Sequence, residues 1–441
     1  MATSSLTDPR LLIVIAHAPA GLGHLRVADA LYHGLPPGVT AVILGSQDKA
    51  MTWLHRFASV HTAARAIFEW LQYGWREDIF TGVYRSLLRS HTKLLEAQLA
   101  ALLAERRDAP TTILVIATYM GLAHQLAAMK ERFEKNHHVR LVIVVVVTDD
   151  APLKIWAVPG ADLIVVPSGS TKQRLEAYHQ TLHPVSSTTY TVAPYPVAPM
   201  LAEALPLQLV GQRKAQLDSA SATAIHVAIP VSGAAVQLSY FSHYMDALKK
   251  ASDRFTFHIV SKEMLSTRSF LADMVGRPNV TVASSPTDQE AVDLYEKLYA
   301  KETIGLEVTK PSEQAFKALV DPTKRGGSIL LLTDPVGRQE WDNLAFLQRH
   351  GLVPKHAGSK RRWEFAEGAS LPDSEMLADA RHWRGLRLPS DPKQAAAFTL
   401  WCLRYGIFAA MADFSGYPKH PELASDGVAR FWERVEAYLR P

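Results

Sequence analysis

The chain has 441 residues, of which 48% are hydrophobic and 20% are charged, and this ordinary globular composition excludes a disordered or fibrous protein. Its length exceeds the usual size of a single hydrophobic core, so we expect two domains. The formal net charge of +4 is small for this length and does not indicate nucleic acid as a partner.

Cysteine content and apolar runs predict where the protein is located. The single cysteine, Cys402, allows no intrachain disulfide, and no basic segment followed by a long apolar stretch opens the chain, so we expect a cytoplasmic protein. The most apolar run, residues 141–147, is far shorter than the roughly 20 residues that span a bilayer. Such a run is typical of a buried strand in a parallel sheet.

Residues 11–31, LLIVIAHAPAGLGHLRVADAL, are predicted to form a strand, a glycine-containing turn and a helix. The unpaired N–H groups at the start of such a helix suit a phosphate. Gly21 and Gly23 allow close approach of a ligand to the backbone, and His24 adds a group that titrates near neutrality. Anion binding and proton transfer are therefore expected at the same turn.

Apolar runs alternate with helix-like segments up to about residue 192, which predicts a first domain over residues 1–195 with a parallel sheet covered on both faces. The runs are LLIVIAH, TAVILG, TTILVIAT, VRLVIVVVVTD, ADLIVVPS and TYTVAP. A helical insertion near residues 50–107 interrupts this alternation. Its aromatic residues are Trp53, Phe57, Phe68, Trp70, Tyr73, Trp75, Phe80 and Tyr84.

A proline-rich, mostly uncharged passage predicts a linker over residues 196–210. The alternation then starts again, which predicts a second Rossmann-like domain over residues 211–390 that faces the first across a cleft. Residues 391–441 are predicted to add two helices that close the structure.

The second domain opens with a strand and a turn that contains Ser232 and Gly233, in the segment IHVAIPVSGAAVQL. Together with the first glycine turn, this turn could hold one diphosphate. Alternatively, it is the small-residue turn that is common in α/β proteins. Neither turn is a P-loop, because no Gly-Lys-Ser/Thr follows the glycines.

Asp149 and Asp150 follow the most apolar strand, at the sheet edge where ligands bind in α/β proteins. A carboxylate there could orient His24 or a substrate hydroxyl, or it could simply cap the next turn. The pair lacks the His and Cys neighbours of a zinc site, so no metal is predicted.

Two polar clusters each follow a predicted strand of the second domain, TKPSEQAF at residues 309–316 and TDPVGRQEWDNLAF at residues 333–346. Their carboxylates and amides suit sugar or ribose hydroxyls, which need paired donors and acceptors. The alternative is helix capping by Ser312 and Asp334. The candidate binding residues are Lys310, Ser312, Glu313, Gln339, Glu340 and Asn343.

Three segments together resemble the two-domain GT-B glycosyltransferases, most of all the monogalactosyldiacylglycerol synthase family and the related peptidoglycan N-acetylglucosaminyltransferase. GLGHLRVADAL resembles the Gly-Gly-Gly-His turn of that family. VTDDAPLKIWAVPGADLIVVPSGSTKQRL resembles its Thr-Asp, Trp and Asp-then-Pro-Ser segment, and GRQEWDNLAFLQRHG resembles its Gly-Gln-Glu and Asn helix.

The resemblance implies an inverting, metal-independent transfer of a sugar from a nucleotide sugar, expected to be UDP-linked, to a lipid or other hydrophobic acceptor. His24 would be the general base on the acceptor hydroxyl or would lie beside it, and no cofactor other than the nucleotide-sugar co-substrate is implied. Asp149, from its place at the end of the most apolar strand, is the further catalytic candidate. Gly21, Gly23 and the second-domain residues Ser232, Gly233, Lys310, Ser312, Glu313, Gln339, Glu340 and Asn343 would bind the nucleotide sugar.

The same resemblance assigns the aromatic insertion to acceptor or membrane contact, since lipid-modifying relatives dock on bilayers through the first domain. We therefore expect a protein that can lie peripherally at the inner face of a membrane. Helices packed on their own aromatic residues are the alternative.

This sequence departs from the family where Lys310 and Pro311 are followed by Ser312 and Glu313 instead of two glycines. Lys317 also falls near the place of the acidic residue that holds the nucleotide ribose in the family. A nucleotide-sugar epimerase or hydrolase, and a binding protein without catalysis, are thus alternative hypotheses. A dehydrogenase is a further one, because Gly21, Gly23 and Asp48 match a dinucleotide fingerprint in part.

Overall fold

The computed structural model describes residues 5–18, 21–46, 70–106, 110–182, 187–231, 235–417 and 420–440. Asp48, residues 50–69 of the aromatic insertion, and the turn at Ser232 and Gly233 lie outside these ranges. The chain divides into two compact units, the first formed by Met1–Pro199 and Ala424–Pro441 and the second by Met200–Leu423.

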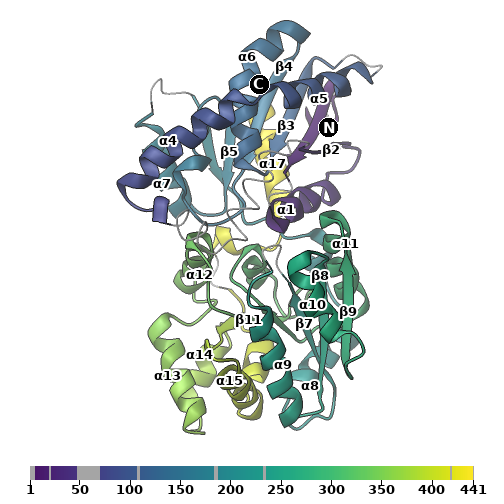
Figure 1. Ribbon diagram of the computed structural model, residues 1–441, viewed down its shortest axis with the longest axis vertical. Helices are drawn as coiled ribbons and strands as arrows, with labels where there is room; N and C mark the ends of the chain where they lie inside the picture. Colours follow the sequence, from purple (N-terminus) through teal and green to yellow (C-terminus); the bar gives the residue numbers. More distant parts are fainter. Residues whose placement is uncertain are drawn as a thin grey trace. The chain divides into compact units, whose positions relative to one another are not determined.

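The first unit is built on a six-stranded sheet in the order β2-β1-β3-β4-β5-β6, in which all neighbouring strands are parallel (Figure 1). Its strands are β1 (Leu11–His17), β2 (Val42–Gly45), β3 (Thr112–Ala117), β4 (Arg140–Val146), β5 (Leu163–Val166) and β6 (Thr189–Val192). All of β4 except Arg140 is buried, because strands flank it on both sides and helices cover the sheet.

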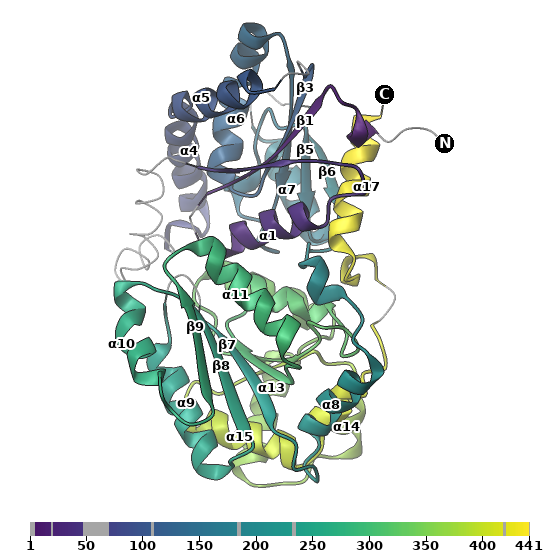
Figure 2. The same ribbon diagram turned by 90° about the vertical axis from the view of Figure 1, so that its right-hand side faces the viewer.

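Helices cover both faces of this sheet, with α4, α5 and α6 on one side and α17 on the other (Figure 2). The helices are α1 (Leu22–His33), α4 (Trp75–Ser90), α5 (Lys93–Ala104), α6 (Met120–His137), α7 (Gly169–His179) and α17 (Gly427–Leu439), with the short 3-10 helices η1 (Ser5–Thr7) and η2 (Lys154–Trp156).

The second unit has its own six-stranded parallel sheet, in the order β12-β11-β10-β7-β8-β9. Its strands are β7 (Ile225–Pro230), β8 (Phe255–Lys262), β9 (Val280–Ser285), β10 (Leu306–Thr309), β11 (Ile329–Leu332) and β12 (Gly385–Arg387). Its helices are η3 (Pro199–Ala202), which begins at the boundary, α8 (Leu207–Leu217), α9 (Leu238–Ala251), α10 (Leu265–Met274), α11 (Asp288–Lys301), η4 (Glu313–Leu319), α12 (Arg338–Arg349), α13 (His356–Glu367), α14 (Ser374–Ala380), α15 (Pro392–Arg404), α16 (Ile407–Ala412) and η5 (Pro421–Leu423).

The predicted fold class is confirmed, since both units are Rossmann-like and together form a two-domain α/β fold of the GT-B type. Each apolar run that was predicted to be a strand is one, and the three-residue strand β12 was not predicted. The segment after Thr309 was expected to be an ordinary helix, and it is the 3-10 helix η4.

The chain passes between the units twice, within the passage predicted as a linker and again after Leu423. Residues 196–210 contain η3 and the first turn of α8. The helices of residues 391–441 are divided, because α15 and α16 pack in the second unit while α17 returns to the first. Trp432 of α17 donates its Nε1 hydrogen to the carbonyl oxygen of Leu31, at 3.1 Å.

Candidate functional site

The strand order of the first unit places a topological switch point between β1 and β3. The chain leaves β1 through α1 to reach β2 on one side, and β3 lies on the other side. In open parallel sheets, ligands bind at the carboxyl ends of the strands at such a point. The turn with Gly21, Gly23 and His24 lies at this place, because α1 begins directly after it.

Gly21 is the residue that precedes α1, with a φ of 143° that side chains rarely permit. A Cβ added there would meet nothing within 4 Å, so the backbone conformation and not crowding requires glycine. No side chain of the described residues caps the N-terminus of α1. Gly23 lies half-buried in the first helical turn, whose N–H groups have no partner within the helix.

His24 is held at the ends of two strands, β3 and β4, through its Nδ1 atom. This atom lies 2.7 Å from the carbonyl oxygen of Thr118, which follows β3, and 3.1 Å from the hydroxyl of Thr148, which follows β4. A carbonyl oxygen can only accept, so Nδ1 carries a hydrogen. In the neutral imidazole the lone pair is then on Nε2, which can take up a proton.

Neighbouring groups also restrict the position of His24. The hydroxyl of Thr118 donates to the backbone carbonyl of His24 at 2.9 Å. The ring of Tyr119 lies edge-on to the imidazole, with centroids 5.2 Å apart, and the Trp156 ring lies 6.2 Å away. Both rings are buried, so His24 has aromatic neighbours that belong to the core.

The two aspartates after β4 differ in their surroundings. Asp150 is buried and accepts hydrogen bonds from the hydroxyls of Ser168 and of Thr171, the latter at 2.8 Å, at the start of α7. Asp150 therefore supports the cap residue of α7, Ser168, which lies 18 residues further along the chain and is not in the next turn. Asp149 is half-buried and directly follows Thr148, the residue through which this strand end reaches His24.

The second unit has the strand order of a dinucleotide-binding Rossmann sheet. From β9 to β12, its strands are the third, second, first, fourth, fifth and sixth of the unit in chain order. The switch point lies between β7 and β10. Residues that follow β10, β11 and β12 at this edge are Lys310, Thr333, Asp334 and Ser390.

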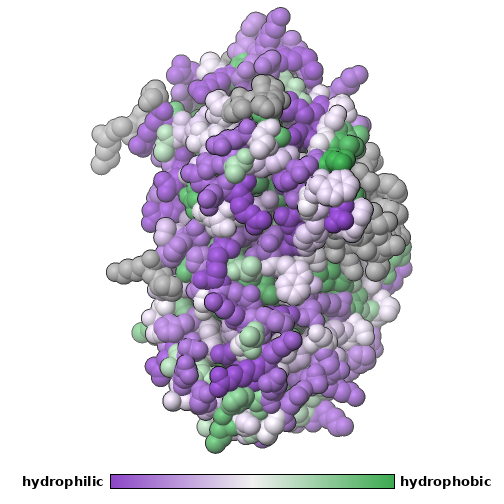
Figure 3. Space-filling view, turned by 90° about the vertical axis from the view of Figure 1, so that its left-hand side faces the viewer, coloured by the Kyte–Doolittle hydropathy of each residue, from purple (hydrophilic) through white to green (hydrophobic). Residues whose placement is uncertain are grey.

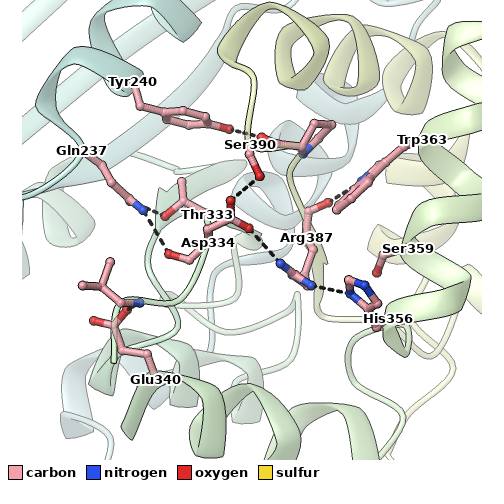
Figure 4. Close-up of polar contacts among 12 residues, drawn as sticks. Gln237, Tyr240, Thr333, Asp334, Glu340, His356, Ser359, Trp363, Arg387 and Ser390 are labelled. Atoms are coloured by element: carbon pink, nitrogen blue, oxygen red, sulfur yellow. Dashed lines mark hydrogen bonds and ion pairs between the residues drawn. The ribbon is translucent and has the colours of Figure 1, made fainter. Parts of the chain in front are cut away.

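Gln237, just before α9, contacts the two residues that follow β11 (Figure 4). Its Oε1 accepts the hydroxyl hydrogen of Thr333 at 2.6 Å, and its Nε2 donates to the carbonyl oxygen of Asp334 at 3.0 Å. The φ of Gln237 is 64°, in the left-handed region that few side chains adopt. Such a conformation persists where surrounding contacts impose it, as at ligand sites.

Arg387, the last residue of β12, crosses the centre of this polar group (Figure 4). One of its terminal nitrogens donates to the Asp334 carboxylate at 2.8 Å and the other to Nδ1 of His356 at 2.8 Å. Ser390 donates to the second Asp334 oxygen. Among the described residues, the buried Nε of Arg387 has no hydrogen-bond acceptor, so an anionic ligand oxygen could complete this guanidinium.

Lys310 and Glu340 form a buried ion pair where β10 meets the start of α12. Glu340 also accepts the backbone N–H of Val336, at 2.6 Å, and so holds the turn before α12. Burial raises the pKa of Glu340, and the positive charge of Lys310 opposes this rise. The structure thus brings these two candidate residues together, with each neutralising the charge of the other.

The other candidates of the second unit lie nearby along the same two segments. Ser312 and Glu313, at the start of η4, are half-buried, and the Ser312 side chain makes no capping hydrogen bond. Asn343 is buried one turn after Gln339, which is half-buried. Asp334 does not cap α12, because that helix begins after Gly337.

Lys317, near the place of the ribose-binding acid in the resembling family, belongs to the core. Its ammonium group pairs with Glu307 at 2.6 Å and contacts the hydroxyl of Tyr299, and both residues are fully buried. Tyr295 also donates to Glu307, at 2.8 Å. Lys317 therefore stabilises the core of the second unit. This position supplies no acidic side chain that could bind a ribose at the strand edge.

Gln237, His356, Arg387 and Ser390 were not predicted from the sequence. Arg387 lies in a strand too short to be recognised, and the conformation of Gln237 is set by its partners. Asp334 was noted only as a possible cap. Its position directly after an apolar strand was the one available signal.

Helix α4 presents an apolar stripe to solvent. Trp75, Ile79, Val83 and Leu87 recur every four residues, and 71%, 59%, 68% and 41% of their surfaces are exposed. Phe80 and Tyr84, one residue further along, stack on each other and face the core. The side of the molecule towards α4 shows apolar patches on a mostly hydrophilic surface (Figure 3).

Within the described part of the chain, no helix combines the length and hydropathy needed to cross a membrane.

No family model matches the chain, and no curated protein matches its sequence. Solved structures resemble it in fold. The UDP-GlcNAc 2-epimerase from Neisseria meningitidis bound to UDP-GlcNAc shares 11% identity over 96% of this chain and 99% of its own, with a TM-score of 0.51. An S. aureus MnaA complex with UDP shares 10% identity over 97% of this chain and 96% of its own, with a TM-score of 0.47.

A UDP-glucosyltransferase from Polygonum tinctorium shares 13% identity over 100% of both chains, with a TM-score of 0.45. The neighbours thus include UDP-sugar glycosyltransferases and UDP-GlcNAc 2-epimerases. At these identities the likeness shows the fold. The narrower resemblance to the monogalactosyldiacylglycerol synthase family and the peptidoglycan N-acetylglucosaminyltransferase stays a prediction.

Proposed function

We propose that this protein is a glycosyltransferase that binds a UDP-sugar through its second unit and uses His24 of the first unit as general base. The observation that carries the proposal is the contact of His24 Nδ1 with the Thr118 carbonyl, which leaves the lone pair of the neutral ring on Nε2. A histidine fixed in this way at a switch point is suited to accept a proton.

In the proposed reaction, Nε2 of His24 takes the proton of an acceptor hydroxyl while its oxygen forms a bond to the anomeric carbon. The bond between that carbon and the diphosphate oxygen breaks, and UDP leaves with the electron pair. Attack on the face opposite the leaving group inverts the anomeric centre. His24 then passes its proton to solvent.

The donor is assigned to the polar edge of the second unit. The guanidinium of Arg387 supplies a buried N–H with no acceptor among the described residues, which suits a phosphate oxygen. Gln339, which is half-buried, offers an amide group for ribose or sugar hydroxyls. No metal ion is assigned a part in this reaction, since hydrogen-bond donors can stabilise the leaving diphosphate.

A hydrophobic acceptor is assigned to the first unit because of the exposed apolar stripe on α4. Arg76 packs over the ring of Trp70, at 4.1 Å from the centroid, so positive charge and aromatic surface occur together there. This combination suits the headgroup region of a membrane that carries a lipid acceptor. A protein-bound or soluble hydrophobic acceptor would use the same apolar surface without a membrane.

The test is a nucleotide screen followed by product analysis. A ligand at 100 times its dissociation constant adds about 2.7 kcal/mol to the free energy of unfolding, so UDP should raise the melting temperature more than other nucleotides. With a UDP-sugar and an acceptor panel, His24→Gln should lower kcat by about 10² to 10⁴ while UDP affinity stays unchanged. His91→Gln, at an exposed histidine of the same unit, is the matched control. A fully active His24→Gln protein would overturn the assignment of the base.

A UDP-sugar epimerase is the second candidate function, because the chain shares its fold with the Neisseria epimerase. Product analysis without acceptor separates the two. An epimerase converts the UDP-sugar into its epimer in the absence of any acceptor, whereas a transferase releases UDP only as the acceptor is glycosylated. UDP binding without turnover would instead indicate a binding protein.

A further inference from the structure

Three side chains that commonly bind metals meet at the C-terminal end of α12. His350 directly follows the last residue of this helix, and His420 and Glu422 come from the segment around η5. Nε2 of His350 lies 3.0 Å from Oε2 of Glu422, and Nδ1 of His420 lies 4.0 Å from the same oxygen. One ligand atom from each residue lies within 4.8 Å of the others.

The ligand types point to one class of ion. Two imidazoles and one carboxylate form a set that zinc uses in proteins, whereas calcium and magnesium prefer oxygen ligands alone. With metal–ligand bonds of about 2.0 to 2.1 Å, neighbouring ligand atoms around tetrahedral zinc lie about 3.3 Å apart. The separations of 3.0 and 4.0 Å lie on either side of that value, so small side-chain rotations would allow three-point binding.

The surroundings favour a cation and leave it a way in. The side chains of His350 and Glu422 are 10% and 12% exposed, and that of His420 is 41% exposed, so one side of the cluster is open to solvent. The C-terminus of a helix attracts positive charge, and His350 lies there. Its ring packs 4.7 Å from Phe346, which holds the imidazole in place.

The hydrogen bond at His420 also suits a ligand. Its Nδ1 accepts the backbone N–H of Glu422 at 3.3 Å, so this nitrogen bears a lone pair. A metal at Nδ1 would replace that long hydrogen bond. Within the described residues this is the one group of three such side chains with ligand atoms at this spacing.

We propose that His350, His420 and Glu422 bind a divalent ion of the zinc class as a structural clamp. The ion would join the end of α12 to the segment that ends at Leu423, where the chain leaves the second unit. Because 11 and 10 positions separate His350 from Gln339 and Glu340, the clamp lies about 15 to 17 Å along the helix from these residues. The clamp is therefore separate from the proposed donor-binding residues and does not depend on the proposed function.

The test is zinc binding by the full-length, tag-free protein after treatment with EDTA. Competition with a chromophoric chelator and elemental analysis should show one ion per chain for the wild type. His420→Gln and Glu422→Gln should each weaken zinc binding by at least about tenfold. His382→Gln, at an exposed histidine of the same unit, should bind as the wild type does. His350 is left unchanged because its ring packs on Phe346.

A second measurement guards against loss of folding. Before zinc is added, the wild type, His382→Gln and His420→Gln should share the same melting temperature. Added zinc should then raise the melting temperature of the wild type and of His382→Gln, and it should leave that of His420→Gln unchanged. The proposal would be overturned if the wild type bound no stoichiometric ion. It would also be overturned if His420→Gln, Glu422→Gln and His382→Gln all weakened zinc binding equally. Either result would leave only a hydrogen bond between His350 and Glu422, and neither would affect UDP binding.

Discussion

The Nδ1 atom of His24 lies 2.7 Å from the carbonyl oxygen of Thr118, although 94 positions separate the two residues in the chain. This contact joins the first turn of α1 to the end of β3. It fixes which imidazole nitrogen carries a hydrogen, and thereby which nitrogen can act as a base. A main-chain oxygen has this role, so substitution of side chains cannot easily remove it.

The hydroxyl of Thr148 is the second group that orients His24, at 3.1 Å. Thr148→Val keeps the shape of this buried side chain and removes one hydrogen bond, worth about 1 kcal/mol. We expect kcat to fall about fivefold with no change in UDP affinity. Steady-state kinetics would measure this effect, with the exposed Thr181→Val as control. An unchanged kcat would show that the Thr118 carbonyl alone is enough to orient the His24 imidazole.

Breaking the pair of Lys310 and Glu340 is expected to destabilise the second unit strongly. Lys310→Met leaves a buried carboxylate without its partner, which costs about 3 to 5 kcal/mol. The double variant with Glu340→Gln should recover most of this loss, because no buried charge remains. Urea denaturation would measure both.

The exposed pair of Lys214 and Asp413 provides the control for that experiment. Lys214→Met should change the free energy of unfolding by less than about 1 kcal/mol. If Lys310→Met were equally mild, the Lys310 pair would be better solvated than its burial indicates.

Arg387 is expected to determine donor affinity. Arg387→Lys keeps the charge but cannot contact Asp334 and His356 together, since lysine lacks the planar fork of arginine. Loss of one charge-assisted hydrogen bond to phosphate should raise the Kd for UDP about tenfold or more. Isothermal titration calorimetry would measure it. Arg361→Lys, at an exposed arginine of α13, should leave the Kd unchanged, and an equal Kd for Arg387→Lys would place the donor elsewhere.

His124 is expected to make the first unit sensitive to acid. Burial lowers the pKa of His124 to about 3, whereas an unfolded histidine titrates near 6.5. Between these values the unfolded chain holds more protons, so the free energy of unfolding falls as the pH falls. From pH 6.5 to 4.5 the loss is about 2 kcal/mol.

The variant His124→Gln tests this pH dependence. Glutamine can still donate to the carbonyl oxygen of Ile155, which the Nε2 of His124 contacts at 2.9 Å, but it does not titrate. Denaturation curves at several pH values should show a flatter decline for His124→Gln than for the wild type. His91→Gln should keep the wild-type decline, and identical slopes for all three proteins would contradict the assignment.

The apolar stripe of α4 is expected to matter for acceptor access and not for folding. Ile79 and Val83 are mostly exposed, so Ile79→Glu and Val83→Glu should change the free energy of unfolding by less than about 0.5 kcal/mol. Both should reduce sedimentation with anionic phospholipid vesicles and transfer to a lipid acceptor. Leu207→Glu, at an exposed leucine of α8, is the control. Equal vesicle binding by all variants would count against membrane contact through α4.

Much of the fold could be predicted from the sequence, because apolar periodicity reports burial directly. The run at residues 141–147 predicts a strand covered on both faces, and β4 is one. The strand β12 was missed because three residues carry too little pattern. The 3-10 helix after Thr309 was also missed, since an ordinary helix and a 3-10 helix differ little in the spacing of apolar residues.

Two α/β domains, the glycine turn before α1 and His24 as the titratable group beside it could be predicted from the residues alone, since these depend on local pattern. The tautomer of His24, the burial of Lys317 against Glu307, and the joining of Gln237, Asp334 and Arg387 became visible only in the folded chain. The contacts of His24 and of Gln237 and Arg387 join segments that are distant in the chain, and the burial of Lys317 against Glu307 depends on how η4 packs on the sheet. A pattern of residues therefore predicts which side chains reach a sheet edge, and only the assembled sheet decides which of them meet.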